Sequence, residues 1–511
     1  MRHGLLILLC LVAVAWFEFQ VYPGHSYLQG ETQLLIPMLE RLDTPGFLSR
    51  DLVAANPTFA YTIYDEITQA LHAEGHLSFE GALYWQQLLF RFAALLGVFL
   101  LARALKVLPF AAVVLAGAVC AITHLSAPDA FVTNPEATPV AFAFSLVLLA
   151  AGLLVHHRPL LASFAAGLAL LYDPVTALAF WAVVVVACLA DSSIRKLLRP
   201  AWPVLLIFAL LLGNLVQLQA GLGSGPELSA RLSTAAIQLT QLRTPWTWVS
   251  HWLAQQIWSY LFLLVAGAWA LTRTWKHSTH FTNWVLIGLA FSGLASVIAA
   301  LLLLNIRSQF AVAMPPARNL SFTVAVALLL CGVASFHIAQ EGKWFQSLPW
   351  AALLLAAILN AQPLDLLHGR LDGLTRASHP TADIRALANW AEQTTWGSSM
   401  FQFPDAGKQT DPGVFRALSR RALWADWNSG IIADYSDDAG QEWWSRWQST
   451  MTQDYSPARL QQMLPLHIDY YVLRRNNELA TIKPAYLNSE YVVYDAQDLR
   501  DARIPLASAT H

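Results

Sequence analysis

Nine ionisable residues are candidates for chemistry, because they lie in the polar connections or at the junctions between long apolar stretches of the sequence. Carboxylates can act as general bases, and arginine binds phosphate through two parallel hydrogen bonds. Such groups are costly to bury beside hydrocarbon, and those that occur there are often functional. The nine residues are His25, Glu31, Asp51, Asp129, Glu136, Asp173, Arg243, Arg307 and Arg318.

Each of these residues also has a structural explanation. Loop charges are commonly only solvated, and Asp173 with Pro174 could simply end one helix and begin the next. Arg307 and Arg318 could reach the lipid headgroups as anchors. Glu18 falls near the outer end of the first apolar stretch, and we expect it to face other helices rather than lipid.

The elements that must position these groups are membrane helices. Hydrophobic residues make up 56% of the chain and charged residues 13%, and one helical crossing needs about 20 apolar residues. We therefore expect a polytopic α-helical membrane protein with about eleven transmembrane helices. The segments 159–175 and 176–191 could be two short crossings or one re-entrant unit. The expected crossings are 4–22, 84–104, 107–124, 137–155, 159–175, 176–191, 201–219, 252–272, 281–304, 319–338 and 345–361.

Basic residues in the short connections set the expected orientation. With the N-terminus inside, the inner connections carry Arg195, Lys196, Arg199 and several further Lys and Arg residues. An odd number of crossings then places the C-terminal part outside. The first apolar segment could instead be a signal peptide cleaved after residues 13–15, but its apolar run continues past that point, which favours an uncleaved helix.

The composition changes after residue 362. We expect a transmembrane domain over 1–362, with an outer loop over 23–83 that contains an amphipathic helix near 60–74. Residues 363–511 predict a small α/β extracytoplasmic domain, because strand-like and helix-like segments alternate there. Its helix is expected at 382–394 and its strands at 399–403, 469–473 and 490–494, with Phe401, Val472 and Val493 in the core.

Several patterns limit the function. All four cysteines fall inside expected crossings, so the outer parts carry no disulfide framework or CxxC metal motif. The net charge of −2 gives no sign of nucleic-acid binding. The chain has neither a P-loop nor a dinucleotide-binding glycine motif. Trp443, Trp444 and Trp447 share roughly one helix face, where they could stack on carbohydrate or pack into a core.

At this level the chain resembles the GT-C superfamily of integral membrane glycosyltransferases, and especially bacterial membrane proteins of that architecture. The resemblance extends over most of the chain through loose motifs. One departure is that Glu31 stands alone where these enzymes usually carry an acidic pair. The matching segments are Phe47-Leu48-Ser49-Arg50-Asp51, Asn134-Pro135-Glu136, Asp173-Pro174, Arg243-Thr244-Pro245, Phe401-Gln402-Phe403-Pro404, Phe415-Arg416 and Ser419-Arg420-Arg421.

The resemblance implies sugar transfer from a polyprenyl-phosphate donor on the outer leaflet of the bacterial inner membrane. Glu31 would be the catalytic carboxylate, with Asp51 in reserve, and the arginines would hold the leaving phosphate. His25, Asp129, Glu136, Arg243, Arg307 and Arg318 are the expected substrate-binding residues. The acceptor would be a glycan, a lipid or a protein. No cofactor is certain, and a divalent metal remains open.

Two other classes of function compete with this interpretation. A lipid or glycan transporter would show repeated halves and charge at the membrane midplane, whereas no repeat is visible and the charges lie at the outer ends. A non-catalytic membrane scaffold of the same fold would retain the architecture without the chemistry, and the solitary Glu31 is compatible with it.

The orientation can be tested with C-terminal fusions. We expect a phosphatase fused after His511 to be active, because that enzyme matures only outside the cytoplasm, and a fluorescent protein at the same site to be dark. The opposite pair of results would show that one crossing has been miscounted.

Overall fold

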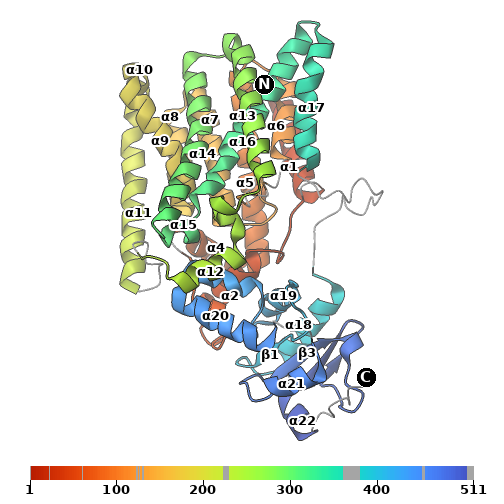
Figure 1. Ribbon diagram of the computed structural model, residues 1–511. Coiled ribbons are helices and arrows are strands. Elements are labelled where there is room, and N and C mark those ends of the chain that lie inside the picture. The colour runs from red at the N-terminus through yellow and green to blue at the C-terminus, as the bar shows by residue number, and fades with distance from the viewer. Residues whose placement is uncertain are drawn as a thin grey trace. The chain divides into compact units, whose positions relative to one another are not determined.

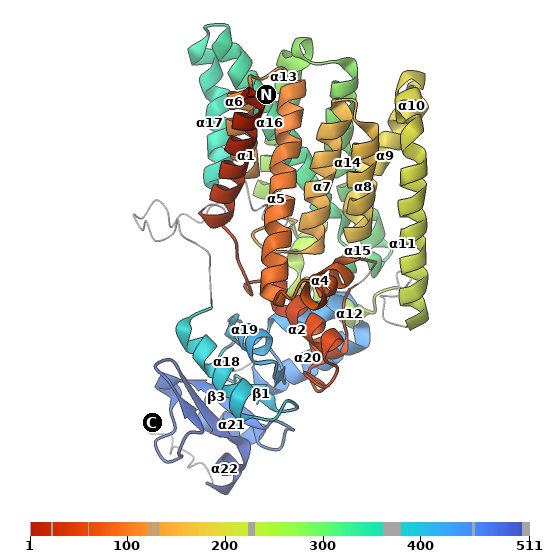
Figure 2. The ribbon, with the colours of Figure 1, turned by 180° about the vertical axis from the view of Figure 1, so that it is seen from behind.

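A computed structural model of the chain describes residues 2–21, 24–59, 61–121, 125, 127–128, 132–222, 230–360, 380–451 and 455–502. The chain forms two compact units. Unit 1 comprises residues 1–25, 59–231 and 244–377, and unit 2 comprises 26–58, 232–243 and 378–511. Figures 1 and 2 show that unit 1 is built of helices, whereas the β-strands belong to unit 2.

Unit 1 has a helix at each of the eleven expected apolar segments. Proline at the first helical position begins four of them, since that position needs no amide hydrogen. Short helices occupy the connections. The long helices are α1 (Arg2–Gln20), α5 (Phe79–Ala104), α6 (Pro109–Cys120), α7 (Pro139–Val155), α8 (Pro159–Tyr172), α9 (Pro174–Ala190), α11 (Trp202–Leu222), α13 (Ala254–Thr274), α14 (His280–Asn305), α16 (Leu320–Gln340) and α17 (Trp344–Asn360). The short elements are α4 (Tyr64–Ala73), α10 (Ser192–Leu198), η1 (Arg199–Ala201), η2 (Pro245–Thr247), η3 (Val249–His251), η4 (Trp275–His277), α15 (Phe310–Ala313) and η5 (Pro316–Asn319).

Among the described residues, six helices are long and apolar enough to cross a membrane. They lie at His3–Gln20, Phe79–Ala104, Ser192–Leu218, Ala254–His277, His280–Asn305 and Pro316–Gln340. The remaining apolar helices are shorter, so the figure of about eleven crossings stays a prediction. The expected pair at 159–191 consists of two helices that meet at Asp173.

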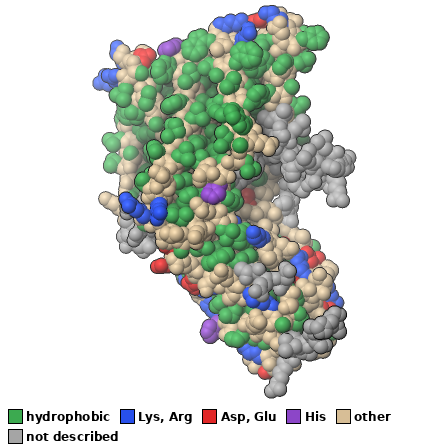
Figure 3. All heavy atoms as spheres, viewed as in Figure 1, with side chains coloured by type: hydrophobic (Ala, Val, Ile, Leu, Met, Phe, Trp, Pro, Cys, Tyr) green, Lys and Arg blue, Asp and Glu red, His purple; other side chains and the backbone are tan. Residues whose placement is uncertain are grey.

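The surface of unit 1 matches a bilayer. Large hydrophobic side chains are exposed along its helices, and Figure 3 shows them spread over the visible face. On α13 and its extension, the exposed Trp258 and Trp275 lie about 25 Å apart along the axis, close to a hydrocarbon thickness of about 30 Å. Tryptophan favours the two membrane interfaces. The protein is therefore a multi-pass membrane protein.

Close helix contacts in unit 1 depend on small residues. A β-carbon at Gly97 on α5 would come within 2.4 Å of the Leu148 carbonyl carbon on α7, and one at Gly152 would come within 2.6 Å of the Gly97 oxygen. Reciprocal glycines therefore let the backbones of α5 and α7 touch, as is common between membrane helices. The same α5 carries the polar residues of the candidate site.

Unit 2 contains a five-stranded mixed sheet in the order β2-β1-β3-β5-β4. Strand β1 (Met400–Gln402) pairs in parallel with β2 (Ala422–Leu423) and β3 (Tyr470–Arg474), while β5 (Tyr491–Asp495) pairs antiparallel with β3 and β4 (Tyr486–Leu487). The strands expected at 399–403, 469–473 and 490–494 are thereby confirmed. Phe401, Val472 and Val493 are fully buried, as expected.

Helices accompany this sheet within unit 2. They are α2 (Thr32–Asp43), α3 (Leu52–Ala55), α12 (Thr234–Arg243), α18 (Ala382–Thr394), α19 (Asp411–Ser419), η8 (Asn428–Asp434), α20 (Asp437–Thr450), α21 (Pro457–Met463), η9 (Arg475–Asn477) and α22 (Ala496–Asp501). Trp443 and Trp447 on α20 are buried and pack around Trp427. They therefore belong to the core rather than to a carbohydrate-stacking surface.

The segments that make up unit 2 differ from the expected division of the chain. From the sequence, 26–58 and 232–243 were assigned to outer connections of the transmembrane domain, but both segments pack with the C-terminal part. The predicted boundary at 362 lies outside the described residues. Residues 26–58 join unit 2 through buried polar contacts such as those from Arg416 and Asn428 to Gln33. These residues are almost 400 positions apart, so a local sequence pattern does not show the contacts.

Candidate functional site

A polar cluster in unit 1 is organised by Gln87 and Arg91, which lie one turn apart on α5. The Arg91 guanidinium donates hydrogen bonds to the backbone oxygens of Glu18, Gly24 and Asn134. Gln87 donates to the backbone oxygens of Asn134 and Pro135. Two side chains of one helix therefore hold the end of α1, the start of the outer loop 23–83 and the connection between α6 and α7.

His25 is the first predicted site residue in this cluster. Its Nδ1 shares a short hydrogen bond with Gln87 Oε1, and its ring stacks on Phe19 with centroids 4.8 Å apart. Only 6% of its surface is exposed. The imidazole is therefore held in one orientation.

Glu136 lies in the connection between α6 and α7 and is as buried as His25. Its backbone nitrogen donates to Asn134 Oδ1 at 2.9 Å, in the segment that Gln87 and Arg91 hold. Gln87 and Arg91 thus bring the segments of two predicted site residues, His25 and Glu136, to the same helix of unit 1, α5.

Glu18 lies in the same region and faces the protein interior, as expected from the sequence, with 4% of its surface exposed. Its Oε1 is buried and accepts no hydrogen bond from the described residues. The charge of Arg91 acts on it. The sequence analysis did not identify Arg91 and Gln87 as site residues. An arginine within an apolar crossing is nevertheless a signal of function or of a specific internal role.

Asp173 and Arg318 form a second polar group in unit 1. Asp173 caps α9 by accepting a hydrogen bond from the Thr176 backbone nitrogen at 3.0 Å, so its role as a helix boundary is real. Arg318 belongs to η5, and its charge acts on Asp173. Asn319 fixes η5 by donating to the Val175 oxygen at 3.0 Å and to Ser296 Oγ at 3.2 Å.

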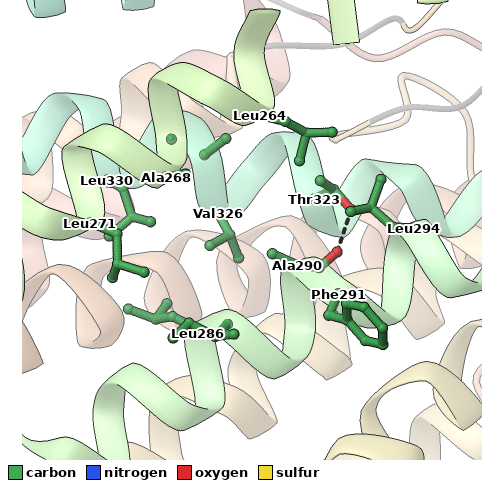
Figure 4. A pocket seen from close by; sticks show the side chains of 13 residues that line it. Leu264, Ala268, Leu271, Leu286, Ala290, Phe291, Leu294, Thr323, Val326 and Leu330 are labelled. Atoms are coloured by element: carbon green, nitrogen blue, oxygen red, sulfur yellow. Dashed lines mark hydrogen bonds between the residues drawn. The ribbon is translucent and has the colours of Figure 1, made fainter. Parts of the chain in front are cut away.

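An apolar groove lies between α13, α14 and α16 (Figure 4). It encloses about 210 Å³ and opens at the surface, where Phe291 is 66% exposed. Small residues such as Ala268 and Ala290 create the space. The hydroxyl of Thr323 donates to the Ala290 oxygen at 2.7 Å, so the lining presents no unsatisfied polar group at this point.

Arg318 precedes α16, which forms one side of the groove. Thr323 lies five residues after Arg318, which corresponds to a rise of about 7.5 Å along a helix. From there the lining follows α16 through Val326, Ala327 and Leu330. Arg318 therefore lies in the turn before the helix that forms one side of the apolar groove.

In unit 2, the predicted Asp51 is a structural residue. It caps α3 by accepting from the backbone nitrogens of Val53 and Ala54, each at 3.0 Å. Its other oxygen accepts from the Leu423 nitrogen at 3.0 Å and lies 3.8 Å from Arg416. Both side chains are about 1% exposed, so Asp51 is occupied by internal contacts.

Glu31 is more exposed than Asp51. It precedes α2, its side chain does not cap that helix, and it is part-exposed. Its backbone oxygen accepts from the nitrogens of Leu34 and Leu35. Among the carboxylates predicted to be catalytic, Glu31 is therefore the one with access to solvent.

Arg243 is bound within unit 2 as well. Its Nε donates to the Trp427 oxygen at 2.8 Å, and its guanidinium lies 4.9 Å from the Trp427 ring centroid. Burial lowers its pKa, against the charges of Asp434 and Asp426. Arg307 is exposed and follows α14 in a left-handed conformation with φ of 59°. Asp129 lies outside the described residues.

The sequence analysis did not identify an acidic pair in the first outer loop, Asp65 and Glu66. Asp65 and Glu66 begin α4, and burial raises the pKa of Asp65 to about 8, with a further contribution from the Glu66 side chain. One Asp65 oxygen is buried and has no hydrogen-bond partner among the described residues. The adjacent Asp-Glu dipeptide was the available signal. Over the described part of the chain, no three His, Cys, Asp or Glu side chains are placed to hold a metal ion.

Comparisons with known proteins give only distant likeness. No protein-family model matches the chain, and no curated protein matches it. It is similar to the oligosaccharyltransferase of Archaeoglobus fulgidus in its apo form, with 13% identity over 92% of this chain and 69% of that chain and a TM-score of 0.45. For the complex of that enzyme with Zn and sulfate the values are 12%, 91%, 68% and 0.39.

The chain is also similar to the arabinofuranosyltransferase AftD from Mycobacteria, with 14% identity over 97% of this chain, 42% of that chain and a TM-score of 0.44. It thus spans less than half of the length of that protein. By name these are glycosyltransferases, the class that the sequence resembles. Because the TM-scores are below 0.5, the likeness defines neither the fold nor the function of this chain.

The structural role of Asp51 can be tested by stability. We expect Asp51→Asn to destabilise unit 2 by about 1–3 kcal/mol, because it weakens the buried acceptor of the Leu423 nitrogen and removes one of the two carboxylates near Arg416. Thermal unfolding of the purified protein measures this. Glu31→Gln is the matched control and should unfold like wild type, since the Glu31 side chain is part-exposed. Equal stability of all three proteins would contradict the assignment.

Proposed function

We propose that this protein transfers a sugar from a polyprenyl-phosphate donor on the outer leaflet of the bacterial inner membrane, with its N-terminus in the cytoplasm. The observation that supports the proposal is the apolar groove of α13, α14 and α16, together with Arg318 in η5, the turn that leads into α16. A lipid phosphate has the same two parts, an anionic head and a hydrocarbon chain.

The fit can be argued part by part. Arginine presents a planar fork that matches phosphate, whereas lysine offers only a point charge. The groove is lined by aliphatic and aromatic side chains and opens at the apolar surface of unit 1. A chain could therefore enter from the bilayer without crossing water. The Asp173 carboxylate is opposite in charge to Arg318, so the phosphate would compete with Asp173 for the guanidinium.

The proposed reaction needs one base and no nucleotide. Glu31 would accept the proton of an acceptor hydroxyl, whose oxygen then forms a bond to the anomeric carbon of the sugar. The bond between that carbon and the phosphate oxygen breaks, and the lipid phosphate leaves with both electrons. Arginine stabilises the charge that develops on the phosphate. His25, Asp129, Glu136, Arg243 and Arg307 remain proposed binding residues, and a divalent metal remains open.

A scaffold function is the second candidate. Asp51, the reserve carboxylate, is fully taken up by capping and by Arg416. This favours a protein that keeps the architecture for binding without transfer. The two functions differ in turnover, although both permit lipid binding.

Donor binding tests the lipid part of the proposal. We expect Arg318→Lys to weaken binding of a fluorescent polyprenyl phosphate to the protein in nanodiscs by about tenfold, the loss of one charged hydrogen bond. Ala268→Phe should also weaken it, because the ring fills the groove. Ala209→Phe is the matched control, since Ala209 is exposed on α11 outside the groove. Equal affinity of all variants would leave Arg318 as a membrane anchor.

Transfer activity tests the base. Glu31→Gln keeps the shape of the side chain and removes its basicity, so we expect sugar transfer to fall by about 10²–10⁴-fold. Donor binding and thermal stability should stay at wild-type values. The assay follows release of polyprenyl phosphate from a polyprenyl-phosphate sugar in proteoliposomes. Unchanged transfer would remove Glu31 from the mechanism, and absence of transfer in wild type with donor bound would favour the scaffold.

A further inference from the structure

A pair of histidines lies in unit 1, away from the groups discussed above. His277 ends η4, the turn between α13 and α14, and His337 lies on α16. Their rings are stacked, with centroids 3.8 Å apart and an angle of 8° between the planes. The stack therefore joins the α13–α14 turn directly to α16, and these three helices also form the apolar groove.

The hydrogen bonding defines where protons can go. His337 Nε2 lies 2.9 Å from the Leu105 backbone oxygen, and because a carbonyl only accepts, this nitrogen carries the hydrogen. A proton added to His337 must go to Nδ1. His277 Nε2 is buried without a hydrogen-bond partner among the described residues. Two neutral rings can pack in this parallel arrangement through van der Waals contact, whereas two charged rings at this distance repel one another.

The charges around the pair are fixed and mostly positive. Lys276 on η4 and Lys106 on the turn between α5 and α6 face His277, and the acidic group there is Glu341 at the end of α16. Glu341 already binds Lys276 at 2.7 Å and Lys343 at 3.0 Å. These two hydrogen bonds lower the pKa of Glu341 to about 2, so Glu341 stays ionised at pH 5.5.

We propose that His277 and His337 form an acid-sensitive latch, which holds the α13–α14 turn on α16 while the rings are neutral and releases it when both become charged. Histidine titrates near pH 6.5, and two imidazolium rings at the stacking distance repel. Folding with neutral rings means that the unfolded chain binds more protons at low pH. Stability is therefore full above the ordinary histidine pKa of about 6.5 and falls as the pH is lowered below it. The latch does not depend on the proposed transfer function.

The experiment compares thermal midpoints of the full chain in nanodiscs at pH 7.5 and pH 5.5. In wild type we expect a clear fall of the midpoint at pH 5.5. His277→Phe keeps an aromatic ring on His337 but cannot be protonated, so most of the fall should disappear. His251→Phe, at a histidine outside the pair, should behave like wild type. A fall of the same size in wild type and His277→Phe would overturn the latch.

A second measurement uses only the wild-type protein, in case His277→Phe does not fold. Hydrogen exchange of residues 275–279 is measured at several pH values and corrected for the intrinsic rate. Loss of protection confined to the acid range, at these residues and at the end of α16, supports the latch. Protection that does not change with pH refutes it.

Discussion

The absence of water from the bilayer interior is the constraint on which this protein depends. Every backbone polar group there must find its partner inside its own helix, which is why unit 1 consists of helices and leaves its irregular backbone at the helix ends. Polar side chains pay the same cost of desolvation. They are therefore found where they bind one another or the backbone, as Arg91 does with three carbonyl oxygens at the ends of chain segments.

The same constraint explains how unit 1 is packed. Helices in lipid gain little from the hydrophobic effect when they associate, so close van der Waals contact matters more. Gly97 and Gly152 allow that contact between α5 and α7. Where small residues are not matched by a neighbour, a groove remains, as between α13, α14 and α16. Small residues therefore have two effects in unit 1. Where a neighbouring helix packs against them they allow close contact, and where none does they leave the groove of the proposed lipid site.

Unit 2 follows the rules of a soluble protein, and Arg416 is its centre. This fully buried guanidinium donates to Asp426 at 3.1 Å, to Ser429 at 2.7 Å and to the Gln33 backbone oxygen at 3.2 Å. A buried charge is stable only when such partners surround it. The contacts join residues 26–58 to the C-terminal part. They also explain why Asp51, a reasonable catalytic candidate by type, serves the fold.

The sequence by itself determined the helices of unit 1, the strands at 399–403, 469–473 and 490–494, and the inward orientation of Glu18, because hydrophobic periodicity and the cost of burial are local properties. Only the tertiary structure decided that Asp51 meets Arg416, that Gln87 and Arg91 hold two outer loops, and that Arg318 heads the helix beside a groove. These contacts join residues tens to hundreds of positions apart. Their energies depend on distance in space and on desolvation, and no local pattern of residue types records either.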